Sequence, residues 1–223
     1  MSKKMLAVCA FLLCGVMLGY TEDVGPQTSK AVVIVPKLAP TKVKVVGISK
    51  EPKAMPFFVY NNAIVPPVDN FAMSGYMGDV SDVKVMGGFT NRFQEVAPCL
   101  KIVYMASGEQ GWAGLIWQNP ANNWGDMEGG YNLSKAKVLS FWARGDQGGE
   151  VVEFKLGGMA AKHPETDSIL SGSVKLKNEW TQYKLDLTAA NLDYISSGFT
   201  FIVKQEFNPN GCTFYMDDIR YDQ

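Results

Sequence analysis

The chain has little of what catalytic and nucleic-acid-binding proteins most often require. Histidine occurs once in 223 residues, at His163, which excludes a histidine-rich metal centre. The 21 lysines and arginines are balanced by 22 acidic residues, and no basic stripe exists that could neutralise phosphates, so we expect no nucleic-acid partner. The motifs G-x-S-x-G, C-x-x-C, G-x-G-x-x-G and the P-loop are all missing.

Carboxylates are the remaining source of catalysis, because a glycosidase needs only two of them across one sugar bond. The 22 acidic residues leave that alternative open. Most of them occupy turns or the polar side of alternating strands, and Asp126, Glu128 and Asp146 are typical of solvated turns. His163 lies in the loop-like stretch "AAKHPETDS", and no serine near it carries the signature of a nucleophile. We therefore expect a protein that is not an enzyme.

Long apolar runs are also scarce, and the one present lies at the start. Lys3 and Lys4 precede an uncharged 16-residue run from Met5 to Tyr20, shorter than the roughly 20 residues of a spanning helix. Residues 1–20 therefore predict a cleaved export signal, with a retained or lipid-linked anchor as the alternative. The protein is then expected outside the cytoplasm: periplasmic, at the cell surface or secreted.

Cysteine is too sparse for a disulfide framework. Cys9 and Cys14 fall within the predicted signal, which leaves Cys99 and Cys212, each at the start of an expected strand. These two fit small buried hydrophobic residues, and the sequence leaves a bridge between them open.

Residues 21–54 predict a tether between the signal and a folded domain at residues 55–223. Proline, lysine, threonine and valine recur there without a helical period, and the prolines prevent a central strand. The stretches "AVVIV" and "VKVVG" could still form edge strands.

From residue 56 onward, apolar residues recur with a period of two, which is typical of half-buried strands. In "VVEFKL", Val152, Phe154 and Leu156 share one face, and "TQYKLDL" and "SVKLK" alternate in the same way. The stretches "CLKIVYM", "VLSFWAR", "FTFIVK" and "TFYMDDIRY" are more continuously apolar, as deeper strands should be. Gly-rich breakers separate the strands, and only "TAANLDYI" could form one or two helical turns. The pattern predicts an all-β fold, an antiparallel β-sandwich or jelly roll.

The stretch "WQNPANNWGD" at residues 117–126 combines two tryptophans with four neutral amides. Sugar rings present C–H patches that suit an aromatic face and hydroxyls that suit amides, and neutral amides avoid the cost of burying a charge. The candidate ligand-binding residues are Trp117, Gln118, Asn119, Asn122, Asn123 and Trp124. Two alternatives stay open: the asparagines could cap turns through their own backbone, and Trp124 could plug the loop onto the sandwich.

The other tryptophans are expected to have structural positions. Trp142, inside "LSFWAR", and Trp180, which opens a strand, are expected to pack in the core or between the sheets. Trp112 and Trp117 lie five positions apart, so a regular strand would point them to opposite faces, and at most one would be buried by that strand.

Four stretches in order carry a resemblance: "LSFWARGDQGGEVVEFKLGG", "SVKLKNEWTQYKLDL", "GFTFIV" and "NPNGCTFYMDDIRYD". Together they resemble the galactose-binding-like jelly-roll carbohydrate-binding modules that are often appended to bacterial glycoside hydrolases. The resemblance covers about residues 56–222. It implies a β-sandwich and non-catalytic binding of a glycan or polysaccharide, although one fold hosts many functions.

The resemblance also implies a structural calcium ion, which such modules often hold near the chain ends with an aspartate of the last strand. Asp217 or Asp218 matches that position, and Asp69 or Asp79 in the N-terminal segment could be a partner. Calcium takes 6 to 8 oxygen ligands, many of them backbone carbonyls, so the sequence cannot complete the set. Alternatively, Asp217 and Asp218 merely solvate a sheet edge.

A second function stays open beside glycan binding. The same sandwich could serve as a structural or assembly protein that contacts other proteins of the cell envelope. The surface around Trp117 and Trp124 discriminates the two hypotheses. A groove lined by aromatic rings and amides favours a glycan, whereas a flat apolar patch of several hundred Å² favours a protein partner.

Overall fold

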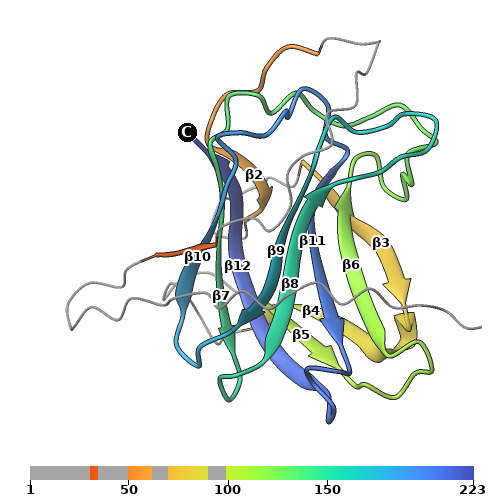
Figure 1. Cartoon of the computed structure of the whole chain (residues 1–223), viewed down its shortest axis with the longest axis vertical. Helices are drawn as coiled ribbons and strands as arrows, with labels where there is room; N and C mark the ends of the chain where they lie inside the picture. The colour runs from red at the N-terminus through yellow and green to blue at the C-terminus, as the bar shows by residue number, and fades with distance from the viewer. Residues whose placement is uncertain (1–30, 35–49, 62–69, 90–98) are drawn as a thin grey trace, which may run out of the picture.

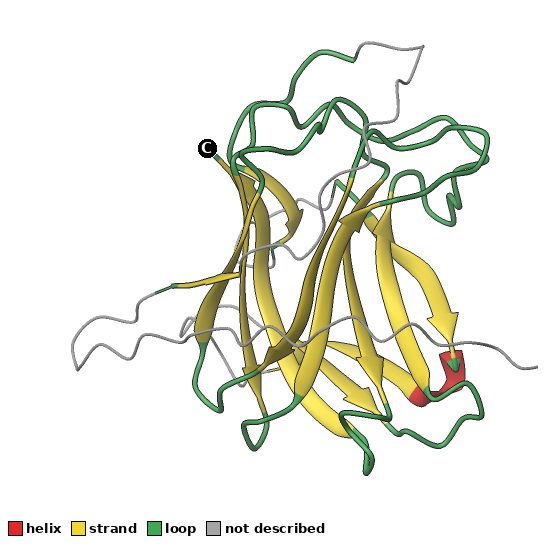
Figure 2. Ribbon diagram, in the orientation of Figure 1, coloured by secondary structure: helices red, strands yellow, loops and turns green. Residues whose placement is uncertain are grey.

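Two β-sheets face each other across one hydrophobic core (Figures 1 and 2). The computed structural model of the chain describes residues 31–34, 50–61, 70–89 and 99–223. Within these ranges the helical structure is a single 3-10 turn, η1 (Val80–Asp82). The predicted all-β sandwich is confirmed.

The larger sheet contains seven of the described strands. In pairing order they are β1 (Val32–Ile34), β10 (Thr181–Asp186), β7 (Val138–Gly145), β12 (Cys212–Asp222), β5 (Cys99–Tyr104) and β4 (Val83–Phe89), with β2 (Phe57–Tyr60) also paired to β12. All pairs are antiparallel except β1 with β10. The "AVVIV" stretch therefore contributes an edge strand, as its composition allowed.

The smaller sheet contains five antiparallel strands. In pairing order they are β3 (Ala72–Gly78), β6 (Trp112–Gln118), β11 (Ser197–Lys204), β8 (Val151–Gly157) and β9 (Ser168–Lys175). The connection that leaves β6 and the one that follows β11 lie at opposite ends of the sandwich (Figure 1).

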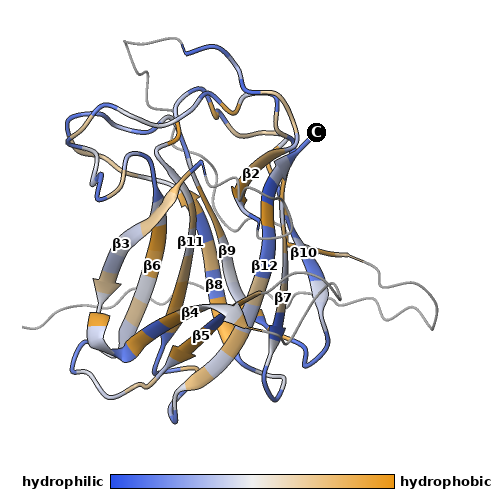
Figure 3. Ribbon diagram, turned by 180° about the vertical axis from the view of Figure 1, so that it is seen from behind, coloured by the Kyte–Doolittle hydropathy of each residue, from blue (hydrophilic) through white to orange (hydrophobic). Residues whose placement is uncertain are grey.

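The core consists of the side chains at every second position of the strands, which point between the two sheets. Val152, Phe154 and Leu156 of β8 are fully buried, as predicted, and polar residues stand between them in Figure 3. Phe141 of β7 packs on Phe154 across the sandwich with ring centroids 4.5 Å apart, and Phe199 of β11 lies against both rings. This contact between strands of different sheets is the interdigitation that holds a sandwich together.

The expectation for Trp142 is wrong, and residues 188–195 do not form the helical turn that their composition allowed. Trp142 is only half-buried and faces outward from β7, because its neighbours Leu139, Phe141 and Ala143 occupy the inward positions. The stretch "TAANLDYI" forms a turn closed by Ala190 N–H donating to the Leu187 carbonyl, 3.0 Å, with no helix.

Cys99 and Cys212 do not form a disulfide with each other. Cys212 lies opposite Tyr104 at one end of the β5–β12 ladder, whereas Cys99 begins β5 at the other end. Five residues of extended strand therefore separate them, about 16 Å, which no disulfide spans. Burial raises the pKa of Cys99 to about 11 and that of Cys212 to about 12, so both remain thiols.

The last residues assigned to the tether contact the sandwich. Lys53 N–H donates to the Asn132 carbonyl, 2.9 Å, and the Lys50 ammonium donates to the carbonyls of Gly129 and Gly130. The predicted signal, the "VKVVG" stretch and Asp69 lie outside the described residues. In the part of the chain that the structure describes, no helix is long and apolar enough to cross a membrane.

Candidate functional site

The predicted ligand-binding stretch begins at the last residues of β6 and continues into a loop at one end of the sandwich. Asn119 is the first residue of that loop, and its hydrogen bonds fix the path of the chain. Its amide nitrogen donates to the Asn70 carbonyl (3.0 Å) and to the Tyr131 hydroxyl (2.9 Å), while its amide oxygen accepts from Gly130 N–H (3.0 Å). Its side chain thus ties together segments that lie 49 residues apart in sequence.

Asn123 is the centre of the loop and is fully buried. Its amide oxygen accepts from the N–H groups of Gly125 (2.9 Å) and Met127 (3.2 Å). Its amide nitrogen donates to the carbonyls of Asn119 (3.2 Å) and Met127 (3.1 Å). All four hydrogen-bonding positions of this amide therefore serve the loop's own backbone, which is the turn-capping role that the sequence left open.

Gln118 closes the loop onto the neighbouring strand. Its amide nitrogen donates to the Asn123 carbonyl (2.8 Å), and its amide oxygen accepts from the Ser74 hydroxyl (2.9 Å). A glycine is required opposite it, because a Cβ atom at Gly75 would lie 2.8 Å from the Gln118 amide carbon. Gln118 is therefore enclosed between β3 and the loop.

Trp117 belongs to the core, since only 1% of its surface is exposed. Its indole packs edge-on against Phe199 (5.5 Å between centroids) and Phe201 (6.2 Å). Trp117, Gln118 and Asn123 thus hold buried positions that support the core and the loop, and their contact with a ligand stays a prediction. Of the pair Trp112 and Trp117, one is buried by the strand, as the alternation required.

Trp124 and Asn122 are the exposed members of the predicted set. Trp124 is 43% exposed at the surface of the loop. Asn122 adopts a left-handed backbone (φ 60°), and its N–H donates to the Ser74 hydroxyl, 2.9 Å, which leaves its amide side chain toward solvent. Asparagine tolerates this conformation better than most residues.

A hollow of about 320 Å³ lies between the beginning of the loop and β3, and neither Asn122 nor Trp124 is among its lining residues. It is lined by Asn70, Phe71, Ala72, Met73, Trp117, Gln118, Asn119 and Ala121. The lining from β3 and the residues before it was missed by the sequence prediction, because those residues are more than 40 positions away and only the register of β3 on β6 brings them here.

A second loop supports the first from the side. His163 N–H donates to the Gly125 carbonyl, 2.7 Å. The second loop is in turn held by buried Glu165, whose carboxylate accepts from the N–H groups of Ser196, Ser197 and Met159 and from both serine hydroxyls. The loop that carries Trp124 is therefore held in place by the second loop, and the indole is exposed in this arrangement.

Of the described aspartates predicted to hold calcium, Asp79 lies apart from Asp217 and Asp218. Asp79 accepts from the N–H groups of Gln110 and Gly111, near the end of β5. Asp217 and Asp218 lie on β12 beside the beginning of β5, and Asp218 accepts from Asn61 and pairs with Arg220 at 3.0 Å. Within the described ranges no three His, Cys, Asp or Glu side chains gather as a metal site. Calcium at Asp217 and Asp218 stays a prediction.

Asp217 is nevertheless unusual, because it is an almost fully buried carboxyl group. Burial is the main cause that raises its pKa to about 6, and the neighbouring Asp218 adds to the effect. One of its oxygens accepts from Asp218 N–H at 2.8 Å. The group is therefore poorly solvated in its charged form.

Known proteins similar to this chain are found among solved structures. The sequence matches no protein-family model and no curated protein. Among solved structures the chain is similar to a family 30 carbohydrate-binding module, with a TM-score of 0.49 and 15% identity over 67% of this chain and 82% of that one. It is also similar to a family 11 carbohydrate-binding module from Clostridium thermocellum in complex with a β-1,3-1,4-mixed-linked tetrasaccharide, with a TM-score of 0.45 and 16% identity over 70% and 89%.

An exo-β-agarase is similar over 76% of this chain but over only 25% of its own length, with a TM-score of 0.48 and 12% identity. The other two structures are carbohydrate-binding modules by their descriptions. At these identities and TM-scores, function has to be argued from this chain's own side chains.

Proposed function

We propose that this protein binds a carbohydrate chain without cleaving it, and that it does so at the exposed residues Trp124 and Asn122 of the loop. The observation that carries the proposal is the exposed indole of Trp124 on a loop whose backbone is held by Asn119, Asn123 and Gln118. A loop whose backbone is fixed by buried hydrogen bonds is pre-organised for a ligand, because little loop entropy remains to be lost on binding.

The chemistry around Trp124 fits a neutral, hydroxylated ligand. The indole offers a flat apolar face and an N–H donor, and the Asn122 amide offers a donor and an acceptor. The 320 Å³ hollow at the beginning of the same loop is lined by the amide residues Asn70, Gln118 and Asn119, with no Lys, Arg, Asp or Glu among its described lining residues. A sugar chain meets these groups without the desolvation of a charge.

The surface around Trp124 does not favour an apolar contact with another protein. Trp117 is buried, so the two tryptophans do not form one patch. The exposed residues around Trp124 include the polar Asn122, Asp126 and Glu128 and one apolar side chain, Met127, so no broad apolar patch forms there. Export of the protein, from the sequence of residues 1–20, is part of this proposal and would place the site where polysaccharides are found.

The test is retention of the full chain in native gels that contain a neutral polysaccharide, run across a panel of cellulose-, mixed-linkage- and mannan-type polymers. Trp124→Ala should remove retention on the polymer that retards the parent protein, because an aromatic anchor dominates such binding. Tyr76→Ala is the matched control: Tyr76 is 42% exposed on β3, and its loss should leave retention unchanged.

Thermal melting of the same variants separates binding from folding. Trp124→Ala should melt within a few degrees of the parent, since a surface side chain contributes about 1 kcal/mol or less. Retention of Trp124→Ala equal to that of the parent would move the site elsewhere on the sandwich. A variant that unfolds, but binds wherever it is folded, would make Trp124 a structural plug.

A further inference from the structure

Residues 50–53, near the end of the predicted tether, dock at the end of the sandwich that carries Trp124. Figure 1 shows this segment, drawn in orange, at the same end as the loop after β6. Asn132 fixes it there: the Asn132 side-chain nitrogen donates to the Lys50 carbonyl at 2.8 Å, and the Asn132 carbonyl accepts from Lys53 N–H at 2.9 Å. The backbone of a segment that the sequence predicts as a linker is thus held by the folded domain.

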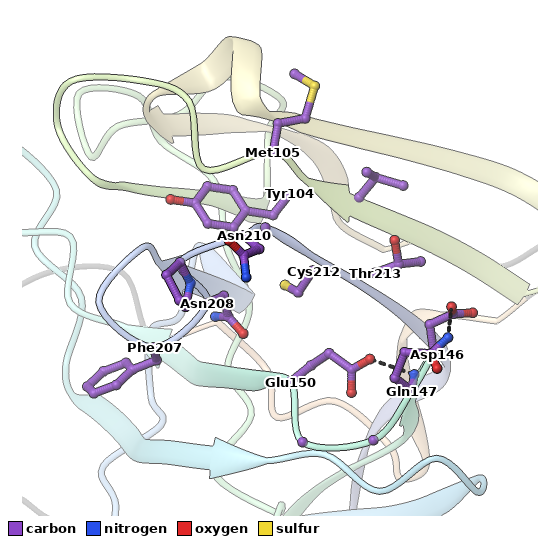
Figure 4. A pocket seen from close by; sticks show the side chains of 15 residues that line it. Tyr104, Met105, Asp146, Gln147, Glu150, Phe207, Asn208, Asn210, Cys212 and Thr213 are labelled. Atoms are coloured by element: carbon purple, nitrogen blue, oxygen red, sulfur yellow. Dashed lines mark hydrogen bonds between the residues drawn. The ribbon is translucent and has the colours of Figure 1, made fainter.

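The hollow at the opposite end of the sandwich is formed without residues of the tether. It has a volume of about 640 Å³ and lies among the residues after β5, the turn between β7 and β8, and the turn between β11 and β12 (Figure 4). Its described lining residues belong to 103–105, 146–150 and 207–213. The two ends therefore differ, and the turn at 146–150 offers an internal reference that the docked tether does not touch.

The Lys50 ammonium reaches the base of the Trp124 loop, residues 119–130. It donates to the carbonyls of Gly129 and Gly130, the latter at 2.8 Å. These glycines close the loop onto its first residue, because Gly130 N–H donates to the carbonyl and to the side-chain oxygen of Asn119, each at 3.0 Å. A Cβ atom at Gly129 would collide with the Asn119 carbonyl oxygen, so the approach is close. Lys50 thus binds where the two ends of the loop meet.

A short run of hydrogen bonds connects this base to Trp124. Met127 N–H donates to the Asn123 side-chain oxygen at 3.2 Å, and the Met127 carbonyl accepts from the Asn123 side-chain nitrogen at 3.1 Å. The same Asn123 oxygen accepts from Gly125 N–H at 2.9 Å, so both neighbours of Trp124 are held by one buried amide. Release of Gly129, two residues beyond Met127, would therefore disturb the backbone that presents the indole.

The charge of Lys50 is partly withdrawn from water at this place. Burial is the main cause that lowers the pKa of Lys50, and the neighbouring Lys53 adds to the effect, whereas the Glu128 carboxylate opposes it. The carbonyls replace part of the lost hydration, and a hydrogen bond from a charged donor is about twice as strong as a neutral one. The charge of the side chain, and not only its length, therefore contributes to holding the loop.

We propose that Lys50 is a positioning residue of the Trp124 loop, and that docking of the tether and binding of a carbohydrate at Trp124 strengthen each other. The inference rests on the proposed function, because both concern the same loop. Its two states are a docked tether, with the ammonium on the base of the loop, and an undocked tether, with the base released. Such a coupling is reciprocal, so the ligand stabilises the docked tether by the factor by which docking tightens binding.

The experiment measures affinity in native gels with increasing amounts of the cellulose-, mixed-linkage- or mannan-type polymer that retards the full-length parent. Lys50→Met keeps an unbranched side chain and removes the ammonium, so it should raise the apparent Kd about five-fold or more. Lys50→Arg restores a cation with several donors, so it should recover most of the affinity. Lys135→Met, at an exposed position shortly after Asn132, is the matched control and should bind as the parent does.

Backbone hydrogen exchange tests the Lys50 contact without any ligand. In Lys50→Met the amides of Met127 and Gly130 should exchange several-fold faster than in the parent, because local opening of the loop becomes easier. The amide of Gln147, at the opposite end, should exchange at an unchanged rate, and the variant should melt within a few degrees of the parent. An oligosaccharide of the retarding polymer should slow exchange of Lys53 N–H in the parent and do so less in Lys50→Met.

Two results overturn the proposal. Retention of Lys50→Met equal to that of the parent, on a polymer whose retention Trp124→Ala abolishes, would show that the loop binds without the Lys50 contact. Unchanged exchange of Met127 and Gly130 in Lys50→Met would show that the ammonium does not hold the loop. Failure of the proposed function has a different signature: no polymer retards the parent, or Trp124→Ala binds as the parent does, whatever the exchange rates of the Lys50 variants.

Discussion

Removing the carboxylate of Glu165 should destabilise the protein more than any surface substitution. Glu165 is buried, and its oxygens accept from three backbone N–H groups and two serine hydroxyls. Two of those N–H groups, on Ser196 and Ser197, lie fully inside the protein at the start of β11. In Glu165→Ala they lose their acceptor and have no water to replace it.

The magnitude follows from these two groups. A buried donor left unsatisfied costs about 1–3 kcal/mol, so two of them make the expected loss about 2–6 kcal/mol. Glu165→Gln keeps one acceptor oxygen and replaces the other with a donor that faces N–H and O–H groups, so its loss should be intermediate. Glu206→Ala, an exposed acid on the turn after β11, is the control and should change stability by less than about 0.5 kcal/mol.

Urea unfolding followed by tryptophan fluorescence measures the free energy of unfolding for the four proteins. A loss below about 1 kcal/mol for Glu165→Ala would refute the reasoning, because it would mean that water or a rearranged loop satisfies the freed donors. Since the loop held by Glu165 supports the Trp124 loop through His163 and Gly125, the alanine variant should also lose polysaccharide retention before it unfolds globally.

Three further outcomes test other parts of the structure. Burial raises the pKa of Asp217 from 3.8 to about 6, so the stability that the neutral carboxyl group provides is full below about pH 4 and is lost as the pH rises through about 6. Asp217→Asn should therefore be up to about 3 kcal/mol more stable than the parent near pH 8 in chelator, and equal to it near pH 4. A bound calcium ion would instead make this variant less stable than the parent in calcium buffer. Gly145→Ala should destabilise by about 1–3 kcal/mol in urea unfolding, because its Cβ would lie 1.7 Å from a Glu150 oxygen, and Glu150→Ala in the same chain should restore part of the loss. Phe141→Ala should cost about 3–5 kcal/mol and Trp142→Ala only about 1 kcal/mol, and the reverse order in thermal melting would contradict the assignment of their faces.

The fold was predictable wherever polar and apolar residues alternate. In "VVEFKL" the polar residues Glu153 and Lys155 mark the outer face, so the inward set is evident. In "VLSFWAR" phenylalanine and tryptophan are adjacent and both apolar, so the pattern does not say which of them enters the core. The register of β7 on β10 and β12 decides it: Phe141 pairs with Tyr183 at inward positions, and Trp142 takes the opposite face.

The candidate site was predictable only in part. An exposed Trp124 follows from its place beyond Pro120 in a loop without alternation. The burial of Gln118 and Asn123 does not follow, because it depends on Ser74 and on the approach of β3, which lie more than 40 residues away. Local sequence shows which groups can hydrogen-bond, but only the folded chain shows whether their partner is backbone or solvent.

The position of β12 has a consequence for how the chain is made. This strand pairs with β7, β5 and β2, so the segment that leaves the ribosome after all the other strands lies inside the larger sheet. Until it arrives, β7 with β10 and β5 with β4 can form only separate ribbons with open edges. The larger sheet is therefore completed only once β12 is available, and a chain that still lacks it exposes the edges on which aggregation begins.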